Sequence, residues 1–559
     1  MSLLNTEQKI KFQKLFIEKK FRELEFEIES ISDFKSRSPF LANLLGVTKL
    51  QKKPNNHEDL IEARNCFYNA YSKDPNFLEA ICNYANLSLK LGDYNHALEI
   101  LVEKRKKNYN PKINEVLARI YFIEGEIDKN LELMREIEKN DDLNPPLGSQ
   151  FLSSLNYSSS FSQEEYLYYC KKIVKKFQIT ERDKNKLEEF SYNNDLKIGF
   201  LSPDFVEHSI YYFFKPLIEQ LQKRKIKVFA FNLRDKNYLD SVSEIIKNQC
   251  DEWVDLYNLS DLDAANLIRK KKINILVDLV GHFRNNRIGL LKYRAAPLQL
   301  SWLGYPNSTG IEEIDYIIAD NNLIKSDEKK YYSENVLELK NIWNCHMGLD
   351  KNLKVQSPPY SRNGFFTFGC FNNPLKISAN CISVWSRILN NTENCKLLIK
   401  GLSKGDNIAQ KKVLEKFKNQ KVDIKKIMFE SRKDKKEDHL KMYNNVDVSL
   451  DTFPYTGVTT SFESIWMGVP VLTKKGNNFT SRCGESINLN LGLKEFIADT
   501  ENDYVNKADE IVRNKKYLID LRSSLRDKSL KTPLFDVNLF GEDFYQLVKS
   551  VWERHSNKK

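Results

Sequence analysis

The spacing of apolar and polar positions divides the chain into a helical part and a part in which strands and helices alternate. Up to about residue 150, apolar residues recur with the three-to-four-residue period of amphipathic helices. Gly92 and Gly125 lie 33 residues apart. The same interval separates Ala85 from Ala118, so one helix–turn–helix design occurs twice. Small residues let paired helices approach closely. The pattern therefore predicts about three stacked helical hairpins within residues 1–150.

A helical bridge is predicted over residues 151–195, and the pattern changes after it. Short apolar segments then alternate with amphipathic helices, which predicts two doubly wound parallel sheets, in domains 196–350 and 364–535. The predicted strands are 197–202, 228–232, 273–279, 298–303 and 316–319 in the first domain, and 365–369, 396–400, 427–430, 446–450 and 469–473 in the second. A polar linker joins the domains, and residues 536–559 predict an aromatic-rich C-terminal helix.

The stretch from Val446 to Thr473 reads as strand, loop, helix and strand. Thr459 and Thr460 fall where the helix begins, and a helix N-terminus presents unpaired N–H groups and a positive dipole end that suit phosphate. Glu463 follows about one turn later, where a carboxylate can accept hydrogen bonds from ribose hydroxyls. The alternative is an ordinary strand–helix–strand unit with a capping threonine and a solvated glutamate. Spacing alone does not separate the two interpretations.

Charge and cysteine usage narrow the function classes. The formal net charge is +11, but the lysines are scattered, so an anionic ligand is favoured over nucleic acid. The nine cysteines are isolated, which argues against structural zinc and a disulfide framework and predicts reduced thiols in a cytoplasmic protein. The N-terminal helix lacks the apolar core of a signal peptide, and no run approaches the roughly 18 apolar residues of a membrane span.

Four motifs in one order carry a family resemblance. They are SPDFxxHS at 202–209, the block 294–310, FNNxxK at 371–376 and SLDTFPYxGxTTxxE at 449–463, the last followed by MGVP. Together they are similar to the O-GlcNAc transferase and SPINDLY family. The resemblance covers roughly residues 40 to 555. It implies α-helical tetratricopeptide-like repeats followed by an α/β GT-B fold, in which two Rossmann-like domains face a cleft.

The resemblance also implies a reaction. The family inverts at the anomeric carbon as it moves a sugar from a nucleotide diphosphate to Ser or Thr hydroxyls of proteins, with no metal and no cofactor. Lys376 would stabilise the leaving diphosphate and counts as catalytic. The implied nucleotide-sugar contacts are Asn373, Lys376, His439, Thr459, Thr460 and Glu463. The alternatives are a solvated lysine for Lys376 and a surface-helix histidine for His439.

On the acceptor side, His208 matches a family active-site histidine and is a candidate general base, since imidazole has a suitable pKa. The alternative is a packing or substrate-positioning role. Four further residues are expected to shape the acceptor side, namely His282, Gly304, Tyr305 and Pro306. Protein acceptors are expected to engage the repeats.

The donor sugar is the least determined part of the prediction. Val458 stands where O-GlcNAc transferases carry a histidine, and several loops are closer to SPINDLY, whose plant member uses GDP-fucose. The predicted donor is UDP-GlcNAc, and the alternative is SPINDLY-like O-fucosyl transfer from GDP-fucose. Two other hypotheses remain: an inactive repeat scaffold, and an enzyme acting on a small molecule or a cell-surface glycan.

Overall fold

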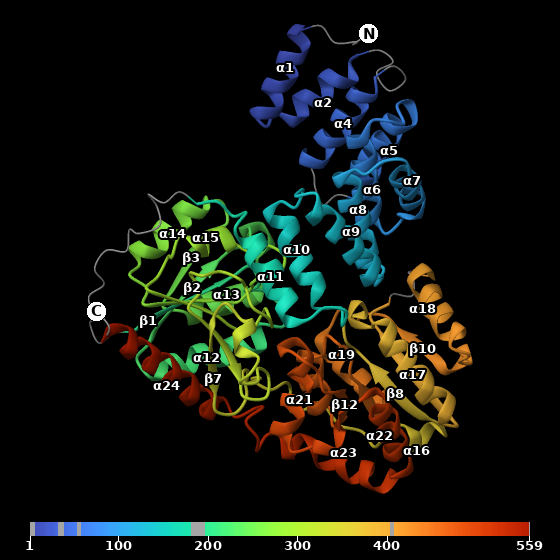
Figure 1. Cartoon of the computed structure of the whole chain (residues 1–559), viewed down its shortest axis with the longest axis vertical. Coiled ribbons are helices and arrows are strands. Elements are labelled where there is room, and N and C mark those ends of the chain that lie inside the picture. The colour runs from blue at the N-terminus through green and yellow to red at the C-terminus, as the bar shows by residue number, and fades with distance from the viewer. Residues whose placement is uncertain (1–5, 32–37, 53–56, 180–195, 403–406, 558–559) are drawn as a thin grey trace. The chain divides into compact units, whose positions relative to one another are not determined.

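The computed structural model describes residues 6–31, 38–52, 57–179, 196–402 and 407–557 (Figure 1). It divides into two compact units, Met1–Leu143 and Asn144–Lys559. None of the helices in the described ranges combines the length and apolarity that a bilayer crossing requires.

The first unit is helical. Its described helices are α1 (Thr6–Ile17), α2 (Phe21–Glu29), α4 (Pro39–Lys52), α5 (His57–Lys73), α6 (Leu78–Leu91), α7 (Asn95–Lys107), α8 (Pro111–Ile123) and α9 (Ile127–Lys139). Successive helices pack as hairpins, α4 on α5, α6 on α7 and α8 on α9. Gly92 caps α6 with φ 78°, a left-handed conformation that favours glycine, and Ala85 and Ala118 are fully buried. The predicted helical repeats are confirmed.

The bridge helices belong to the second unit. The expected boundary at residue 150 falls inside α10 (Pro145–Leu155), and the first compact unit already ends at Leu143. Asn144 sets this start, because its side chain accepts a hydrogen bond from the Leu147 amide at 2.9 Å ahead of a proline at the first helical position. Helix α11 (Gln163–Val174) follows. The rest of the predicted bridge, 180–195, lies outside the described residues.

The first α/β domain contains a seven-stranded parallel sheet in the order β3-β2-β1-β4-β5-β6-β7. Its strands are β1 (Lys197–Ser202), β2 (Lys227–Asn232), β3 (Glu252–Asp255), β4 (Ile275–Asp278), β5 (Leu298–Ser301), β6 (Tyr316–Asp320) and β7 (Asn335–Leu339). Its helices are α12 (Tyr211–Lys223), α13 (Ser241–Gln249), α14 (Asp261–Lys270) and α15 (Ile288–Lys292). The sequence patterns missed β3 and β7, because both are edge strands with few buried positions.

The second α/β domain contains a six-stranded parallel sheet in the order β10-β9-β8-β11-β12-β13. Its strands are β8 (Phe366–Cys370), β9 (Cys395–Lys400), β10 (Ile427–Glu430), β11 (Val448–Leu450), β12 (Val471–Lys474) and β13 (Ile497–Ala498). Its helices are α16 (Tyr360–Asn363), α17 (Ala379–Asn391), α18 (Asn407–Asn419), α19 (Lys436–Lys441), α20 (Thr459–Trp466), α21 (Phe479–Leu491), α22 (Glu501–Arg513) and α23 (Lys515–Ser529). This is the Rossmann order, in which the chain reverses direction across the sheet between β8 and β11.

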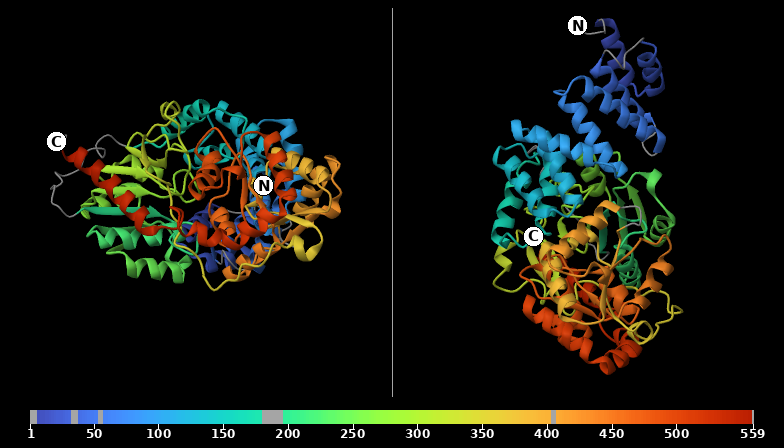
Figure 2. Two further views of the ribbon diagram at one scale, coloured as in Figure 1. Left: turned by 90° about the horizontal axis from the view of Figure 1, so that it is seen from below. Right: turned by 90° about the vertical axis from the view of Figure 1, so that its right-hand side faces the viewer.

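The last helix, α24 (Val537–Ser556), returns to the first α/β domain, where it packs on α12 and β7 (Figures 1 and 2). Gln220 on α12 donates to Asn538 at 3.0 Å. Trp302 beyond β5 lies 6.2 Å from Phe540 and 5.1 Å from Phe544, between ring centroids. The core of the first domain therefore includes residues from the end of the second.

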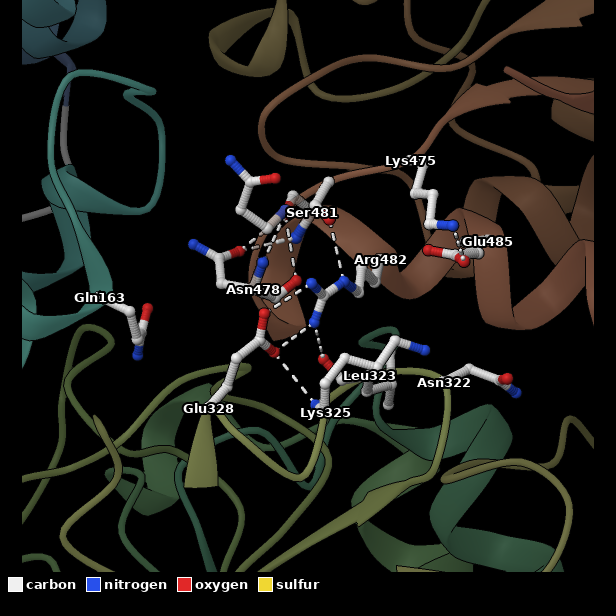
Figure 3. A network of polar contacts seen from close by, with 12 residues as sticks. Gln163, Asn322, Leu323, Lys325, Glu328, Lys475, Asn478, Ser481, Arg482 and Glu485 are labelled. Carbon is white, nitrogen blue, oxygen red and sulfur yellow. Dashed lines mark hydrogen bonds and ion pairs between the residues drawn. The ribbon is translucent and has the colours of Figure 1, made fainter. Parts of the chain in front are cut away.

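Polar contacts also join the two α/β domains directly (Figure 3). Arg482 on α21 donates from Nη2 to Glu328 at 2.7 Å and from Nη1 to the Leu323 carbonyl at 3.2 Å. Near this network, Ser486 donates to Asp320 at 2.7 Å. The Arg482 side chain is 7% exposed, so its charge is held out of water and depends on these partners.

Aromatic stacking forms a second junction between the domains. His346, in the segment that joins them, stacks on Tyr212 of α12 with ring centroids 5.3 Å apart and on Phe462 of α20 with centroids 5.6 Å apart. The ring is fully buried, and burial lowers the pKa of His346 to about 3. A neutral imidazole therefore links α12 to α20.

Gly304→Ala tests the close backbone approach between Gly304, which follows β5, and Leu279, which follows β4. A Cβ at Gly304 would lie 1.8 Å from the Leu279 carbonyl oxygen, so the backbone must shift. We expect a loss of about 3 kcal/mol or more of unfolding free energy, measured by urea denaturation.

Gly364→Ala is the matched control, because a Cβ there meets no atom within 4 Å and only the positive φ of 72° is strained. Its loss of unfolding free energy should stay at about 1 kcal/mol. Equal losses in the two variants would contradict the packing argument.

Candidate functional site

The strongest site candidate lies at the carboxyl edge of the second sheet, where β8 and β11 pair. The loop 371–378 follows β8 and the loop 451–458 follows β11. Parallel strands end at the same edge, so the two loops meet there, at the point where ligands bind in open α/β sheets. Most of the predicted nucleotide-side residues lie on these loops or on α20.

Lys376 ends a short 3-10 turn in the first of these loops. Its Nζ donates to the Thr456 carbonyl at 2.9 Å and lies 3.8 Å from the centroid of the Tyr455 ring. Burial lowers the pKa of Lys376 to about 8, and Asp451 opposes that shift only in part. A partly desolvated ammonium at this edge is suited to bind an anion.

The structure brings Asn372, rather than its neighbour, into this network. Asn372 is 6% exposed and donates to Asp451 at 3.0 Å and to Thr452 at 2.8 Å, while Thr460 donates to its carbonyl oxygen. Asn373, the predicted contact, is exposed and caps the turn by accepting from the Leu375 amide at 3.1 Å. Contact of Asn373 with a nucleotide sugar remains a prediction.

The predicted helix start at the threonine pair is confirmed. Helix α20 begins at Thr459, and its N-cap residue Val458 makes no side-chain capping bond. Among the described residues, the Thr459 hydroxyl has no hydrogen-bond partner, while the Thr460 hydroxyl binds Asn372. The first turn therefore keeps backbone and hydroxyl donors at the same edge as Lys376.

Glu463 is a buried carboxylate, which makes the solvated-glutamate interpretation wrong. It is 3% exposed and accepts from His439 Nε2 at 2.8 Å, from Tyr443 at 3.2 Å and from Lys436. Burial by itself would raise the pKa of Glu463, but the hydrogen bond from His439 and the charge of Lys436 outweigh it and lower the pKa to about 2. The carboxylate is therefore ionised and fixed in place.

His439 on α19 is not a free surface histidine. Its side chain is 12% exposed. The Nε2 atom is hydrogen-bonded to Glu463, and the Nδ1 atom is hydrogen-bonded to Lys400 at the end of β9. Burial lowers the pKa of Lys400 to about 8. Lys436 adds an interdomain contact, with its Nζ 4.6 Å from the Tyr212 ring centroid.

Lys400, Lys436 and Tyr443 were missed by the sequence reasoning. A weak signal existed for two of them. Lys400 ends a predicted strand, and Lys436 precedes His439 by three residues, about one helical turn.

His208 lies in the loop between β1 and α12, at the carboxyl edge of the first sheet. Its side chain is exposed, and its Nδ1 accepts only a long hydrogen bond, 3.4 Å, from the Ile210 amide. The adjacent Glu207 accepts from the Tyr212 hydroxyl at 2.6 Å. Through Tyr212 the His208 loop adjoins Lys436 of the second domain, so the two sheet edges meet here.

The other predicted acceptor-side residues lie in the interior. Tyr305 is 2% exposed, and its hydroxyl meets Tyr166 at 2.5 Å and Asn156 at 3.2 Å. The Pro306 carbonyl accepts from Thr480 at 2.9 Å. These contacts pack the bridge helices and α21 against the first sheet. Gly304 instead approaches the Leu279 carbonyl within the first domain.

His282 is equally enclosed, at 2% exposed. Its Nε2 donates to the Thr309 carbonyl at 2.7 Å, which leaves Nδ1 to accept from Ser149 at 3.0 Å. Burial lowers the pKa of His282 to about 4. This neutral ring lies among packed groups, and contact with an acceptor remains a prediction for it.

Two Rossmann-like domains follow one another in the chain, and the second carries a lysine and a helix N-terminus at the carboxyl edge of its sheet, which is where ligands bind in such folds. The family model for glycosyl transferase family 41 matches residues 168–348 and 362–544. The chain belongs to glycosyl transferase family 41.

Relatives agree with this assignment. A probable UDP-N-acetylglucosamine–peptide N-acetylglucosaminyltransferase SPINDLY from Hordeum vulgare is 33% identical over 422 residues, which is 73% of this chain but 44% of that protein. The similarly named SEC protein of Arabidopsis thaliana is 27% identical over 64% of this chain and 37% of its own length. The chain thus spans less than half the length of these relatives.

A variant of the Thermobaculum terrenum O-GlcNAc transferase has a similar fold. The TM-score is 0.82 over 94% of this chain and 99% of that one, at 22% sequence identity. The expected architecture, helical repeats followed by a GT-B pair of domains, is confirmed.

The paired state of Glu463 predicts a pH-dependent stability. Because its folded pKa lies below the usual value near 4.3, its contribution is present above the unfolded pKa and is lost as pH falls toward 2. Glu463→Gln should therefore lower the unfolding free energy by roughly 2–3 kcal/mol at pH 7. The deficit should shrink below about pH 4, measured by urea denaturation at several pH values.

Glu437→Gln serves as the control, since Glu437 is exposed on the same helix as His439. It should change stability by less than about 0.5 kcal/mol at every pH. A deficit for Glu463→Gln that stayed constant from pH 7 to pH 3 would show that the ionised pair is not its source.

Proposed function

We propose that this chain is an inverting protein O-glycosyltransferase, which transfers a sugar from a nucleotide diphosphate to Ser or Thr hydroxyls without a metal. The observation that carries the proposal is the placement of Lys376 and the start of α20 on adjoining loops at the β8–β11 edge. Both present positive electrostatic potential at the same edge of one sheet.

In this proposal the leaving diphosphate is stabilised by these two groups. Negative charge grows on the diphosphate as the sugar–phosphate bond breaks, so preorganised donors bind the transition state more strongly than the ground state. Lys376 keeps N–H donors beyond the one used by Thr456, and the hydroxyl of Thr459 is available.

The nucleoside would bind along α19 and α20. A carboxylate has more acceptor positions than Glu463 uses for Lys436, His439 and Tyr443, so ribose hydroxyls can add to them. His439 would stack on the base, held at the required angle by its bonds to Glu463 and Lys400.

His208 is the proposed general base for the acceptor hydroxyl. Its exposure at the facing sheet edge supports this role, because a base must reach the proton it removes. An acceptor-positioning role for the same side chain is the alternative.

The donor is proposed to be UDP-GlcNAc, which the names of the relatives specify for those proteins. GDP-fucose is the second candidate, supported by Val458 ahead of the threonine pair and by the SPINDLY-like loops. Both donors present a diphosphate to Lys376, so the same site chemistry serves either.

The acceptors are proposed to be proteins that bind the helical repeats of the first unit, because stacked hairpins form an extended surface. The proposed compartment is the cytoplasm, which is supported by nine isolated cysteines that are all buried.

Purified protein incubated separately with UDP-GlcNAc and GDP-fucose tests the proposal, with release of UDP or GDP as the readout. One donor should turn over in the wild type. Lys376→Ala should lower that rate at least about 100-fold, since it removes a main stabilising charge from the transition state.

Lys351→Ala is the control, because Lys351 is an exposed lysine of the same chain. It should keep the wild-type rate, and both variants should keep the wild-type melting temperature within a few degrees. Turnover of neither donor by the wild type would favour an inactive scaffold, and wild-type turnover by Lys376→Ala would remove its proposed role.

The repeats generate a separate prediction. A chain beginning at Asn144, the start of the second compact unit, should hydrolyse the donor like the full chain. Its transfer to protein acceptors should fall more than about tenfold, since the tethering surface is lost. Equal transfer by both chains, measured by mass spectrometry of glycosylated proteins, would exclude the repeats as the acceptor-binding part.

A further inference from the structure

The aromatic ring of Tyr455 lies directly beside the ammonium group of Lys376. It lies in the loop between β11 and α20 and is 8% exposed. The ammonium nitrogen of Lys376 is 3.8 Å from its ring centroid, well within the roughly 6 Å of a cation–π contact. The aromatic face is therefore a direct partner of the charge.

The ring is held in that position by its own surroundings. It packs against Tyr157, which follows helix α10, with centroids 4.9 Å apart. The Tyr455 carbonyl accepts from Thr452 at 2.7 Å, and the Thr456 hydroxyl donates to the Thr480 carbonyl at 2.8 Å. Lys376 thus meets a ring whose loop is fixed by hydrogen bonds.

The groups in contact with the Lys376 ammonium carry no net charge. Among the described residues no carboxylate lies within 4.0 Å of its Nζ, which contacts the Thr456 carbonyl and the Tyr455 ring instead. The titratable groups that face it at longer range are Asp451, Cys370 and Cys483. A carboxylate partner would cancel the charge and repel a diphosphate, whereas a ring and a carbonyl leave the net charge intact.

We infer that Tyr455 is a positioning residue whose aromatic face keeps the ammonium of Lys376 protonated and oriented toward the phosphate-binding edge. The catalytic part of this inference rests on the function proposed above, whereas the electrostatic part concerns the free protein. The stabilisation comes from the electron-rich face of the ring and not from the phenol hydroxyl.

The first test measures the ionisation of Lys376 without any nucleotide. Trace acetylation of the full chain across a pH series, followed by peptide mass spectrometry, gives the midpoint at which the Lys376 amine becomes reactive. Tyr455→Phe should keep the wild-type midpoint. Trifluorophenylalanine incorporated at position 455 has nearly the same shape but a weaker face, and should lower the midpoint by about half to one and a half pH units.

The second test is kinetic and uses the donor that the wild type turns over. Tyr455→Phe should keep kcat, whereas the trifluorophenylalanine protein and Tyr455→Leu should lose about 3- to 30-fold in kcat/KM, mostly in kcat. Tyr257→Leu, at an exposed tyrosine of the first α/β domain, is the matched control and should change neither constant. If Tyr455→Leu fails to fold, the isosteric fluorinated ring still gives the answer.

The two tests separate the failure of this inference from the failure of the proposed function. Equal midpoints for phenylalanine and trifluorophenylalanine at position 455 would overturn the inference, whatever the chain does with sugars. A lowered midpoint in a protein that turns over neither donor would leave the positioning of Lys376 supported and would overturn the proposed function.

Discussion

A charged group taken out of water needs partners within the protein, and this requirement orders the second α/β domain. Glu463 is nearly inaccessible and stays ionised only because Lys436 and His439 converge on it. Arg522 shows the same requirement away from the site, where its buried guanidinium donates to the carbonyls of Gln356 and Tyr443. Each of these buried charged side chains lies where the protein supplies hydrogen-bond donors or acceptors for it.

Lys376 satisfies the requirement in a different way, and that difference bears on function. A buried cation that pairs with a carboxylate is neutralised, as Arg482 is by Glu328. Lys376 meets a ring face and a carbonyl, which stabilise an ammonium without removing its charge. The ion pair of Arg482 with Glu328 thus joins the two α/β domains, whereas Lys376 leaves an uncancelled charge at the sheet edge that suits an anion.

The sequence predicted those parts of the fold and of the candidate site that depend on local patterns of residues. Strands with apolar runs were predicted, including the edge strand β10. The edge strands β3, β7 and β13 were missed, because β3 and β7 have few buried positions and β13 is only two residues long. The threonine pair was placed at a helix start correctly, since helix signals are local. The burial of Asn372 beside Asp451 and the enclosure of His282 depend on packing between distant segments, which a motif does not contain.

The return of α24 to the first α/β domain has a consequence for how the chain is made. Gln220 and its partner Asn538 are 318 residues apart, and Trp302 packs on rings that emerge from the ribosome only with that last helix. The first domain therefore has an unfilled apolar surface throughout synthesis of the second. Its core closes only after translation has passed both sheets, so folding domain by domain during synthesis does not complete the first domain before the second exists.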